Sequence, residues 1–335
     1  MQPEHPFAQY IRILGKGKRG SRGLTEQEAY DSMAMVLANE VEECQLGAYL
    51  MLLRVKEETP EEVAGFVRAV KTTFSLPNNA PEVMLDWSSY AGKRRHLPWF
   101  LLSALLLADN DISVFMHGAE GHTAGRIYTR DILKVLGQPV TESLQQAADE
   151  ISKTNFAYLP LEFLSPKLHT IIQMRPLLGL RSPVHTIARL LNPFKADCEI
   201  QGIFHPSYRD THQHAAKLLN QPHLAVLKGE GGEIERNPDQ LCLVKYVNNG
   251  ELLEEEWPAL FNGPRHLKDE SMDPKRLIEV WQGNDADEYG IASITGTAAI
   301  ALKLLKKAHN QEEAQQLAET LWNSRNKNKF HGSSR

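Results

Sequence analysis

The sequence predicts an α/β protein, in which a small N-terminal all-helical domain precedes a larger α/β domain with a central sheet flanked by helices. Three observations lead to this fold class. The 335 residues are enough for two domains, helix-start signals recur between residues 24 and 76, and short apolar runs alternate with helical patterns from about residue 82 onward. The expected boundaries are residues 1–76 for the helical domain, 77–320 for the α/β domain and 321–335 for a basic, flexible tail.

Two helix starts define the N-terminal domain. Thr25 and Glu28 match a capping box, in which each side chain accepts a hydrogen bond from the other residue's backbone. Thr59, Pro60 and Glu62 place an N-cap, a first-turn proline and an N3 carboxylate in the order that begins a helix. An apolar stripe at helical spacing lies between these starts and consists of Leu46, Leu50 and Leu53.

Short apolar runs predict the strands of the second domain, because strands covered by helices on both faces are continuously apolar. The runs are Ile112–Phe115, Ile200–Phe204, His223–Leu227 and Leu241–Val247. Residues from about 160 to 190 are helical in pattern, with starts at Ser165-Pro166 and Ser182-Pro183, and we expect them to pack on the N-terminal helices. The longest apolar run, Leu97–Ala108, is too short to span a bilayer and predicts a buried helix.

The composition excludes several classes of protein. Apolar residues make up 42% and charged residues 24%, which is typical of globular chains and unlike disordered or collagen-like ones. Three distant cysteines, Cys44, Cys198 and Cys242, exclude a disulfide framework and a paired-cysteine metal knuckle. The first residues lack the charged and apolar regions of a secretory signal. We therefore expect a cytoplasmic protein with no membrane partner.

Basic residues gather in three runs that contain no acidic residue. The runs 12–22, 93–95 and 325–335 hold twelve of the 37 Lys and Arg residues, although the net charge of the chain is −5. Local positive charge on an acidic protein attracts polyanions at those places. The alternative interpretation is that the runs are solvated loops and a frayed chain end.

Two long segments resemble one family. Residues 24–70 are similar to the N-terminal helical domain of the anthranilate phosphoribosyltransferases and pyrimidine nucleoside phosphorylases. RPLLGLRSPVHTIARLLNP, residues 175–193, aligns without a gap on the family pattern R-x-x-L-G-x-R-T-x-F-N-x-L-G-P-L-x-N-P. The resemblance covers about residues 10–320. It implies the phosphoribosyltransferase and nucleoside phosphorylase type of fold and a homodimer through the N-terminal helices, for which the leucine stripe with Tyr49 is the expected contact.

The catalytic motifs of that family are altered here. Its G-T-G-G-D loop, whose glycines let backbone N–H groups approach the diphosphate of phosphoribosyl diphosphate, falls on residues 88–92, where Tyr90 and Ala91 take glycine positions. The K-H-G-N-R motif falls on residues 116–120 and keeps only His117 and Gly118. Arg126 and Arg130 are candidate substitutes for the lost lysine. For His117 the alternative is a satisfied buried histidine.

The family's magnesium pair is also incomplete. The adjacent Asp-Glu pair falls on Glu233 and Ile234, and Glu235 comes one residue late. Mg²⁺ demands near-octahedral geometry, so a displaced ligand is expected to point away. Glu230, Glu233 and Glu235 are left as metal candidates, and the alternative is a Gly-rich turn with solvated carboxylates. His212 and His214 are expected at the surface.

The preferred functional hypothesis is sequence-independent binding of DNA or RNA. GKGKRGSRGLT (15–25) and KGEGGEIERNPD (228–239) resemble a divergent subgroup of anthranilate phosphoribosyltransferase-like proteins that is associated with such binding as homodimers. A Gly-rich basic arm suits contacts to phosphates, not to base edges. The acidic pI near 6.2 and the lack of aromatics among the cations argue against it. The residues expected to contact nucleic acid are Lys16, Lys18, Arg19, Arg22, Lys93, Arg94 and Arg95.

The alternative is a Mg²⁺-dependent phosphoribosyltransferase that uses phosphoribosyl diphosphate and an aromatic amine such as anthranilate. A nucleoside phosphorylase ranks last, because it needs the same glycine loop. Under the preferred hypothesis no cofactor is required, and Mg²⁺ belongs only to the enzymatic alternative. Arg175 and Arg181 suit a carboxylate or a phosphate, or else form an internal ion pair. The residues assigned to a vestigial donor and substrate site are Ser88, Ser89, Gly92, His117, Gly118, Arg126, Arg175 and Arg181.

Overall fold

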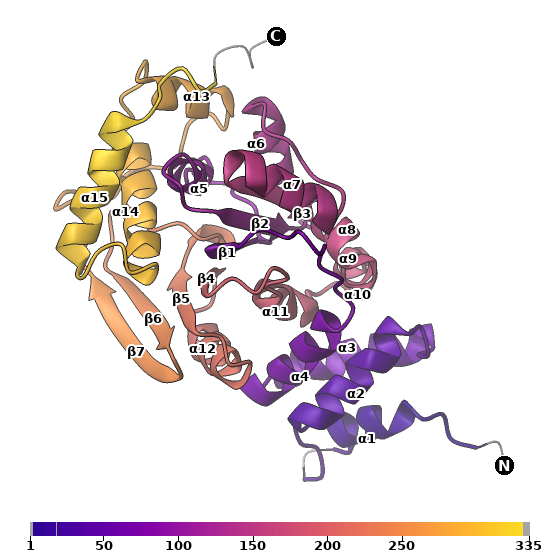
Figure 1. Ribbon diagram of the computed structural model, residues 1–335. Helices are drawn as coiled ribbons and strands as arrows, with labels where there is room; N and C mark the ends of the chain where they lie inside the picture. Colours follow the sequence, from indigo (N-terminus) through magenta and orange to yellow (C-terminus); the bar gives the residue numbers. More distant parts are fainter. Residues whose placement is uncertain (1–2, 18, 331–335) are drawn as a thin grey trace.

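The structure of the protein is a computed structural model, which describes residues 3–17 and 19–330 (Figure 1). Both predicted helix starts are present: Thr25 and Glu28 form a capping box, and so do Thr59 and Glu62. Glu62 is fully buried and also accepts a 2.8 Å hydrogen bond from the backbone of Leu24, which fixes the chain before α2 against α4. The N-terminal domain consists of α1 (Ala8–Gly15), α2 (Glu26–Leu37), α3 (Glu43–Lys56) and α4 (Pro60–Lys71).

The leucine stripe of α3 lies inside this domain. Leu46, Leu50 and Leu53 are at most 8% exposed, and Tyr49 is fully buried against Phe7 and Phe66. These side chains are therefore the core of the helical domain, because one chain already covers the face that the sequence assigned to a partner. The expected dimer contact is wrong in its residues, while the oligomeric state is still a prediction.

A mixed sheet forms the centre of the second domain, and its order within the described residues is β3-β2-β1-β4-β5-β6-β7. Strands β1 to β5 are parallel, whereas β6 and β7 continue the sheet in antiparallel pairs. The predicted fold class is confirmed, and the four predicted strands appear as β2, β4, β5 and β6. The strands are β1 (Leu85–Ser89), β2 (Val114–Gly118), β3 (Phe156–Pro160), β4 (Cys198–Ile203), β5 (His223–Lys228), β6 (Cys242–Asn248) and β7 (Glu251–Trp257).

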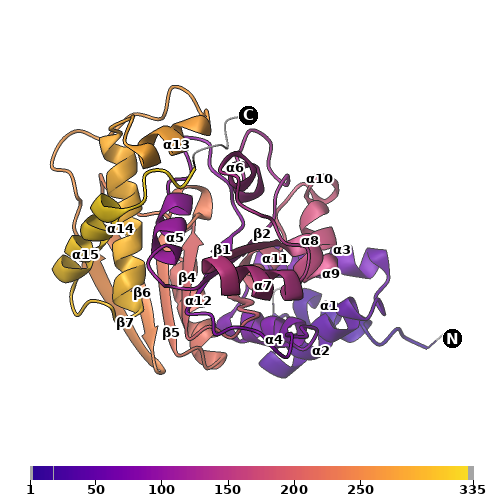
Figure 2. The ribbon, with the colours of Figure 1, turned by 45° about the horizontal axis from the view of Figure 1, so that its top comes forward.

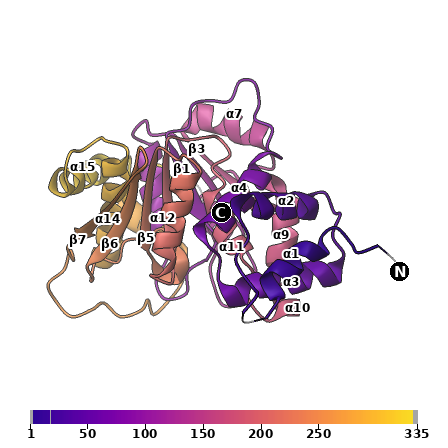
Figure 3. The ribbon, with the colours of Figure 1, turned by 90° about the horizontal axis from the view of Figure 1, so that it is seen from below.

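Two apolar cores lie on opposite faces of the sheet. Successive side chains of a strand point to opposite faces, so Val114 and Met116 join one core and Phe115 joins the other. The first core is closed by α5, α14 and α15, which gather on one side in Figure 2. The second core is continuous with the N-terminal domain, which lies beside α9 and α11 in Figure 3.

The connecting helices follow the alternation of the sequence. The predicted buried helix is confirmed, since every residue of α5 is buried. Among the described residues, no helix is both long and apolar enough to cross a membrane. The helices after α4 are α5 (Phe100–Ala108), α6 (Thr129–Val135), α7 (Leu144–Thr154), α8 (Leu161–Leu164), α9 (Pro166–Gln173), α10 (Arg175–Leu178), α11 (Val184–Ile187), η1 (Ala188–Leu190), α12 (Tyr208–Leu218), η2 (Glu230–Gly232), α13 (Lys275–Gln282), α14 (Glu288–Leu304) and α15 (Gln311–Ser324).

The end of the chain, expected as a flexible basic tail, is folded as far as it is described. Arg325 donates hydrogen bonds to the carbonyls of Val280 and Trp281, and its guanidinium lies 3.5 Å from the ring centre of Trp322. Phe330 is 1% exposed and packs against Trp281. The stacking of cationic and aromatic side chains onto α13 and α15 explains the difference. Residues 331–335 lie outside the described residues.

Candidate functional site

The residues of the altered motifs meet at the carboxyl ends of the central parallel strands. Residues 88–95 comprise the end of β1 and the loop after it, and residues 228–236 comprise the last residue of β5 and the loop after it. In open α/β sheets this edge is the usual place of a ligand site. The structure brings the two loops into direct contact, and three glutamates of the second loop, Glu230, Glu233 and Glu235, bind polar groups of the first.

Glu233 fills the loop that follows β1. Its carboxylate accepts hydrogen bonds of 2.6 Å from the backbone N–H groups of both Ala91 and Gly92, and one of 2.9 Å from the hydroxyl of Ser89. Glu233 is fully buried, as are Ser88 and Ser89 apart from a few per cent of their surface. The N–H groups that a phosphate would need are thus already bound to a carboxylate of the protein itself. We call residues 88–95, whose N–H groups Glu233 occupies, the closed loop.

Two glycines allow Glu233 to reach this position. A Cβ atom at Gly229 would lie 1.7 Å from the carbonyl oxygen of Glu233, and one at Gly202 would lie 2.4 Å from its carbonyl carbon. Any larger residue at either position would push the Glu233 backbone away from the loop. The glycines of this region therefore allow two backbone segments to pack closely. Neither sequence interpretation of Glu233, as a metal ligand or as a solvated carboxylate on a turn, describes this arrangement.

Lys93 is the cation of the site, and it is buried. Its ammonium forms ion pairs with Glu230, at 2.9 Å, and with Glu235. Burial lowers the pKa of Lys93, but the two carboxylates outweigh burial, so that the pKa is raised and the side chain is charged. With 1% of its surface exposed, Lys93 is closed to nucleic acid, contrary to the expectation from the basic run.

The carboxylates do not fit a magnesium ion. Glu233 is bound to three hydrogen-bond donors, Glu235 is bound to Lys93 and to the backbone N–H of Phe100, and Ile234 has no ligand atom. Within the described part of the chain, no group of three or more His, Cys, Asp or Glu side chains has the arrangement of a metal site. The metal assignment of Glu233 and Glu235 is therefore corrected.

The second motif forms part of the core. His117 is fully buried, with Nε2 3.1 Å from Asp86 and Nδ1 2.6 Å from the hydroxyl of Tyr90. Tyr90, which stands at a glycine position of the family loop, thus points into the protein. Gly118 is required where it is, since a Cβ there would lie 2.1 Å from the carbonyl oxygen of Ser89. The interpretation of His117 as a satisfied buried histidine fits these contacts.

The structure places the three arginines of the predicted donor and substrate site, Arg126, Arg175 and Arg181. Arg126 donates to the carbonyls of Ala91 and Gly92, and Arg175 donates to the carbonyl of His122. Burial, together with neighbouring arginines, lowers the pKa of Arg181 to about 10. The internal ion pair that was the alternative role of Arg175 or Arg181 is absent from the described residues.

Arg189 is a further residue of this region that the motifs did not indicate, and it replaces the proline of the pattern L-G-P. Its guanidinium is buried and donates to the backbone carbonyls of Gly202 and His185. A charged residue at a proline position was the available signal. His212 was also misplaced: it is 2% exposed, with Nδ1 2.7 Å from Gln201, whereas His214 is exposed as expected.

The remaining basic residues lie at the surface. Arg94 and Arg95 are exposed. Their backbone N–H groups donate to Glu230, and the carbonyl of Arg95 accepts from the backbone of Asp269, while neither guanidinium is bound to any described residue. Lys16 and Arg19 of the N-terminal arm are exposed as well. Arg22 forms two hydrogen bonds with Glu28, of 2.6 and 2.7 Å. Lys18 lies outside the described residues.

The chain matches known proteins along most of its length. Residues 8–73 match the helical bundle domain of the glycosyl transferase family, and residues 100–325 match the α/β domain of that family. The chain belongs to the glycosyl transferase family. This assignment agrees with the resemblance to anthranilate phosphoribosyltransferases that the motifs indicate.

Relatives of this chain include enzymes and proteins without a stated activity. An anthranilate phosphoribosyltransferase of Ignicoccus hospitalis is 26% identical over 319 residues, 92% of each chain. An uncharacterized protein of Aquifex aeolicus is 29% identical over 72% of this chain and 73% of its own length, and the Escherichia coli protein YbiB is 28% identical over 72% and 76%. Among solved structures, the anthranilate phosphoribosyltransferase of Thermus thermophilus has a TM-score of 0.78 at 21% identity, covering 96% of this chain and 95% of its own.

Proposed function

We propose that this glycosyl transferase family member is a sequence-independent nucleic-acid-binding protein whose donor site has become part of the core. The observation that carries the proposal is how the basic residues divide. Lys93 is buried between two carboxylates, whereas Arg94, Arg95, Lys16 and Arg19 are exposed and form no ion pair among the described residues. Exposed, unpaired cations are those that can exchange their counterions for phosphates.

The closed loop argues against a diphosphate donor. A donor would have to displace Glu233 from the N–H groups of Ala91 and Gly92, and the freed carboxylate would then repel it. Hydrogen bonds to a charged group contribute about 1.5–3 kcal/mol each. The loop therefore favours its internal anion over a bound one.

A surface hollow beside Arg95 offers a path for a strand of nucleic acid. The hollow measures about 540 Å³ and is also lined by Arg209, Lys228 and Arg265. Its acidic members are Glu256, Asp239 and the two carboxylates that pair with Lys93, Glu230 and Glu235. Phe204 at its edge is 49% exposed, which gives a surface on which a base can stack. Arg95, Lys228 and Arg265 lie on loops or a strand end, and Arg209 lies in the first turn of α12. Because most of these cations are not on a helix, contacts to the backbone of nucleic acid are favoured over contacts to base edges.

Fluorescence anisotropy with labelled single- and double-stranded DNA of two unrelated sequences tests the proposal. We expect binding at about 50 mM salt that weakens steeply with salt and differs little between the two sequences. The variant Arg94→Ala/Arg95→Ala/Lys228→Ala should bind more weakly. A matched control replaces three exposed lysines of α7, α12 and α13, Lys153, Lys217 and Lys275, with alanine. Absence of binding by the parent protein at about 50 mM salt contradicts the proposal.

A second candidate function is phosphoribosyl transfer to an aromatic amine. It is favoured by the likeness to the Ignicoccus enzyme over 92% of both chains and by the presence of Arg175, Gly179 and Asn192 at their pattern positions. An assay of phosphoribosyl-anthranilate formation with Mg²⁺ decides between the two. Turnover that Arg175→Ala abolishes would establish the enzyme, and we expect none.

A further inference from the structure

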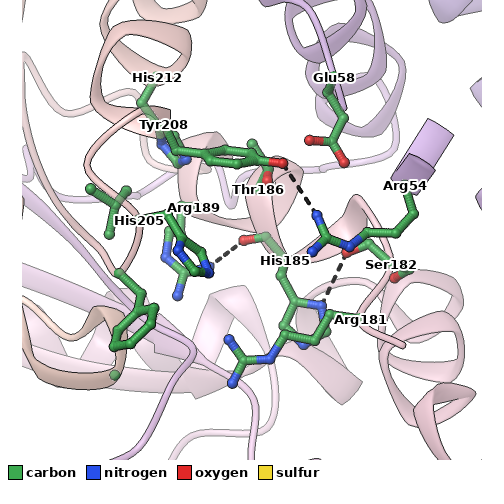
Figure 4. Close-up of a pocket in the computed structure, with 13 residues that line it drawn as sticks. Arg54, Glu58, Arg181, Ser182, His185, Thr186, Arg189, His205, Tyr208 and His212 are labelled. Carbon is green, nitrogen blue, oxygen red and sulfur yellow. Dashed lines mark hydrogen bonds between the residues drawn. The ribbon is translucent and has the colours of Figure 1, made fainter. Parts of the chain in front are cut away.

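A second cavity lies between the two domains, apart from the closed loop. It measures about 110 Å³, and residues 88–95 take no part in its lining. Arg54 and Glu58 approach it from the helical domain, while Ser182, His185 and Arg189 approach it from the α/β domain (Figure 4). A ligand here would contact both domains.

Three buried polar atoms of the lining have no hydrogen-bond partner among the described residues. They are Oε2 of Glu58, Oγ of Ser182 and Nε2 of His185. The three residues are only 6%, 6% and 7% exposed. Each such atom costs about 1–3 kcal/mol when it stays unpaired, and native proteins pair nearly all of them. Three around one cavity indicate a polar ligand that completes their hydrogen bonds.

The cavity is positively charged. Arg181 and Arg189 line it, and within the described residues neither guanidinium lies within ion-pair distance of a carboxylate. Burial first, and then the proximity of Arg126, Arg189 and Arg175, lowers the pKa of Arg181 to about 10. The positive charge of Arg181 is therefore repelled by the neighbouring arginines, and a bound anion would offset that repulsion.

His185 adds a requirement to the charge of the ligand. Its Nδ1 lies 3.2 Å from the carbonyl oxygen of Ser182, and a carbonyl accepts, so Nδ1 carries the proton. Burial, reinforced by His122 and Arg181, lowers the pKa of His185 and keeps the ring neutral. Nε2 is then an acceptor, and the ligand must donate a proton to it. At neutral pH hydrogen phosphate has such a proton, whereas sulfate has none.

We propose that this cavity binds a tetrahedral oxyanion that still carries a proton, of which hydrogen phosphate is the simplest member. Arg181 and Arg189 neutralise its charge, Ser182 donates to an oxygen, and Nε2 of His185 accepts the hydrogen bond of the protonated oxygen. Glu58, whose pKa burial raises, contributes a further polar contact from the helical domain. The ligand would thus hold the turn between α3 and α4 and the α11 region together.

Isothermal titration of the full chain with inorganic phosphate and, separately, with sulfate at equal ionic strength and pH 7.5 tests this site. We expect phosphate to bind at least about tenfold more tightly than sulfate, a difference of about 1.4 kcal/mol. Arg181→Gln should weaken both anions. His185→Gln, whose amide can donate as well as accept, should bring the phosphate-to-sulfate ratio close to one. Ser182→Ala should weaken phosphate several-fold with little effect on folding.

The control is Lys275→Gln on α13, which removes an exposed cation outside the cavity and should leave phosphate binding unchanged. Thermal unfolding without ligand checks that each variant is folded. Equal affinity of the parent for phosphate and sulfate, or undiminished phosphate binding in both Arg181→Gln and Ser182→Ala, would overturn the proposal. The titration contains no nucleic acid, so its outcome is independent of the function proposed above.

Discussion

The carboxylate of Glu233 accepts a 2.6 Å hydrogen bond from the backbone N–H of Gly92, which lies 141 residues earlier in the chain. This bond joins the loop after β1 to the loop after β5 at the edge where parallel strands usually offer their N–H groups to a ligand. With Lys93 between Glu230 and Glu235 one residue further on, the site contains its own anion and its own cation. Glu233 thus supplies the negative charge that a phosphate ligand would bring, and Lys93 supplies the positive charge that a metal ion would bring.

Replacing Glu233 should destabilise the protein. Glu233→Ala removes a buried carboxylate with three donors and leaves the N–H groups of Ala91 and Gly92 unpaired, so we expect a loss of about 3 kcal/mol in the free energy of unfolding. Urea denaturation measures it. Glu251→Ala, at an exposed end of β7, should change stability by less than about 0.5 kcal/mol. A loss in Glu233→Ala no larger than that of this control would show that the internal anion is dispensable.

Lys93 should stabilise the folded protein, because it neutralises the carboxylates of Glu230 and Glu235. Lys93→Met leaves the carboxylates of Glu230 and Glu235 without a counter-charge, and breaking a buried pair in this way costs about 3–5 kcal/mol. The double variant Lys93→Met/Glu235→Met also removes the more deeply buried carboxylate and should recover part of that loss. Glu230 is left, but it is partly exposed and still accepts hydrogen bonds from the backbone of Arg94 and Arg95. Chemical denaturation of both variants is the measurement, with Lys275→Met on α13 as the exposed control. No recovery in the double variant would contradict the ion-pair assignment.

Glu199 should make stability depend on pH. It is 1% exposed on β4, next to Asp86 on β1, and burial raises its pKa to about 8. A carboxyl whose pKa is higher in the folded state stabilises the protein at acidic pH, and this contribution is lost as the pH rises from about 4.5 to about 8. Glu199→Gln has no such loss.

The comparison of Glu199→Gln with the parent is made by urea denaturation at pH 5 and at pH 8.5. We expect nearly equal stability at pH 5 and a gain for the variant on the order of 2–4 kcal/mol at pH 8.5. Glu251→Gln is the exposed control. A stability difference between Glu199→Gln and the parent that does not change with pH would show that Glu199 titrates normally.

Much of the fold follows from local signals in the sequence. Capping residues such as Thr25 and Thr59 define helix starts by backbone hydrogen bonds within four residues, so sequence alone predicts them well. The apolar runs of β4 and β5 are equally clear. Three strands were missed because their patterns are unusual: β1 reads LDWSS, β3 ends in a proline, and β7, an edge strand, is mostly glutamate.

The candidate site was predicted less well, because its contacts join residues far apart in the chain. The motifs placed Ser89, Gly92 and Glu233 at one site, and the structure brings the three residues into contact. A spacing pattern does not show which hydrogen-bond donor a carboxylate binds. The burial of Lys93 was equally hidden, since its neighbours Arg94 and Arg95 are exposed. Charge runs read along the sequence thus overestimate the cations that are free to bind a polyanion.

A homodimer is predicted from the family resemblance. Light scattering at micromolar concentration should give twice the 37.7 kDa mass of the chain. The leucine stripe of α3 is internal, so Leu50→Ala should unfold or destabilise the protein before it changes the mass. A stable species of 37.7 kDa over the whole concentration range would contradict the prediction.

The structure revises how steeply nucleic-acid binding should depend on salt through the N-terminal arm. Four arm cations, each neutralising one phosphate, would contribute a slope of about −3.6 to log K against log salt, at about −0.9 per contact with duplex DNA. Arg22 is held by Glu28 in two hydrogen bonds, so it is already neutralised. Lys16, Lys18 and Arg19 are left, and the expected contribution of the arm falls to about −2.7 per subunit.

Replacing Lys16, Lys18 and Arg19 together by alanine should therefore make the measured slope less negative by about 2.7 and weaken binding at low salt. Arg22→Ala should change the slope by less than about 0.9, because the arginine must leave Glu28 before it can bind a phosphate. The arm variant should keep its fold, since Lys16 and Arg19 are exposed and make no side-chain contact that the core needs. Anisotropy titrations between about 50 and 400 mM salt give these slopes, and the triple variant of Lys153, Lys217 and Lys275 controls for lost charge alone. If the arm variant and this control have the same slope, the arm is not the binding element, and the cations beside Arg95 are left to account for the affinity.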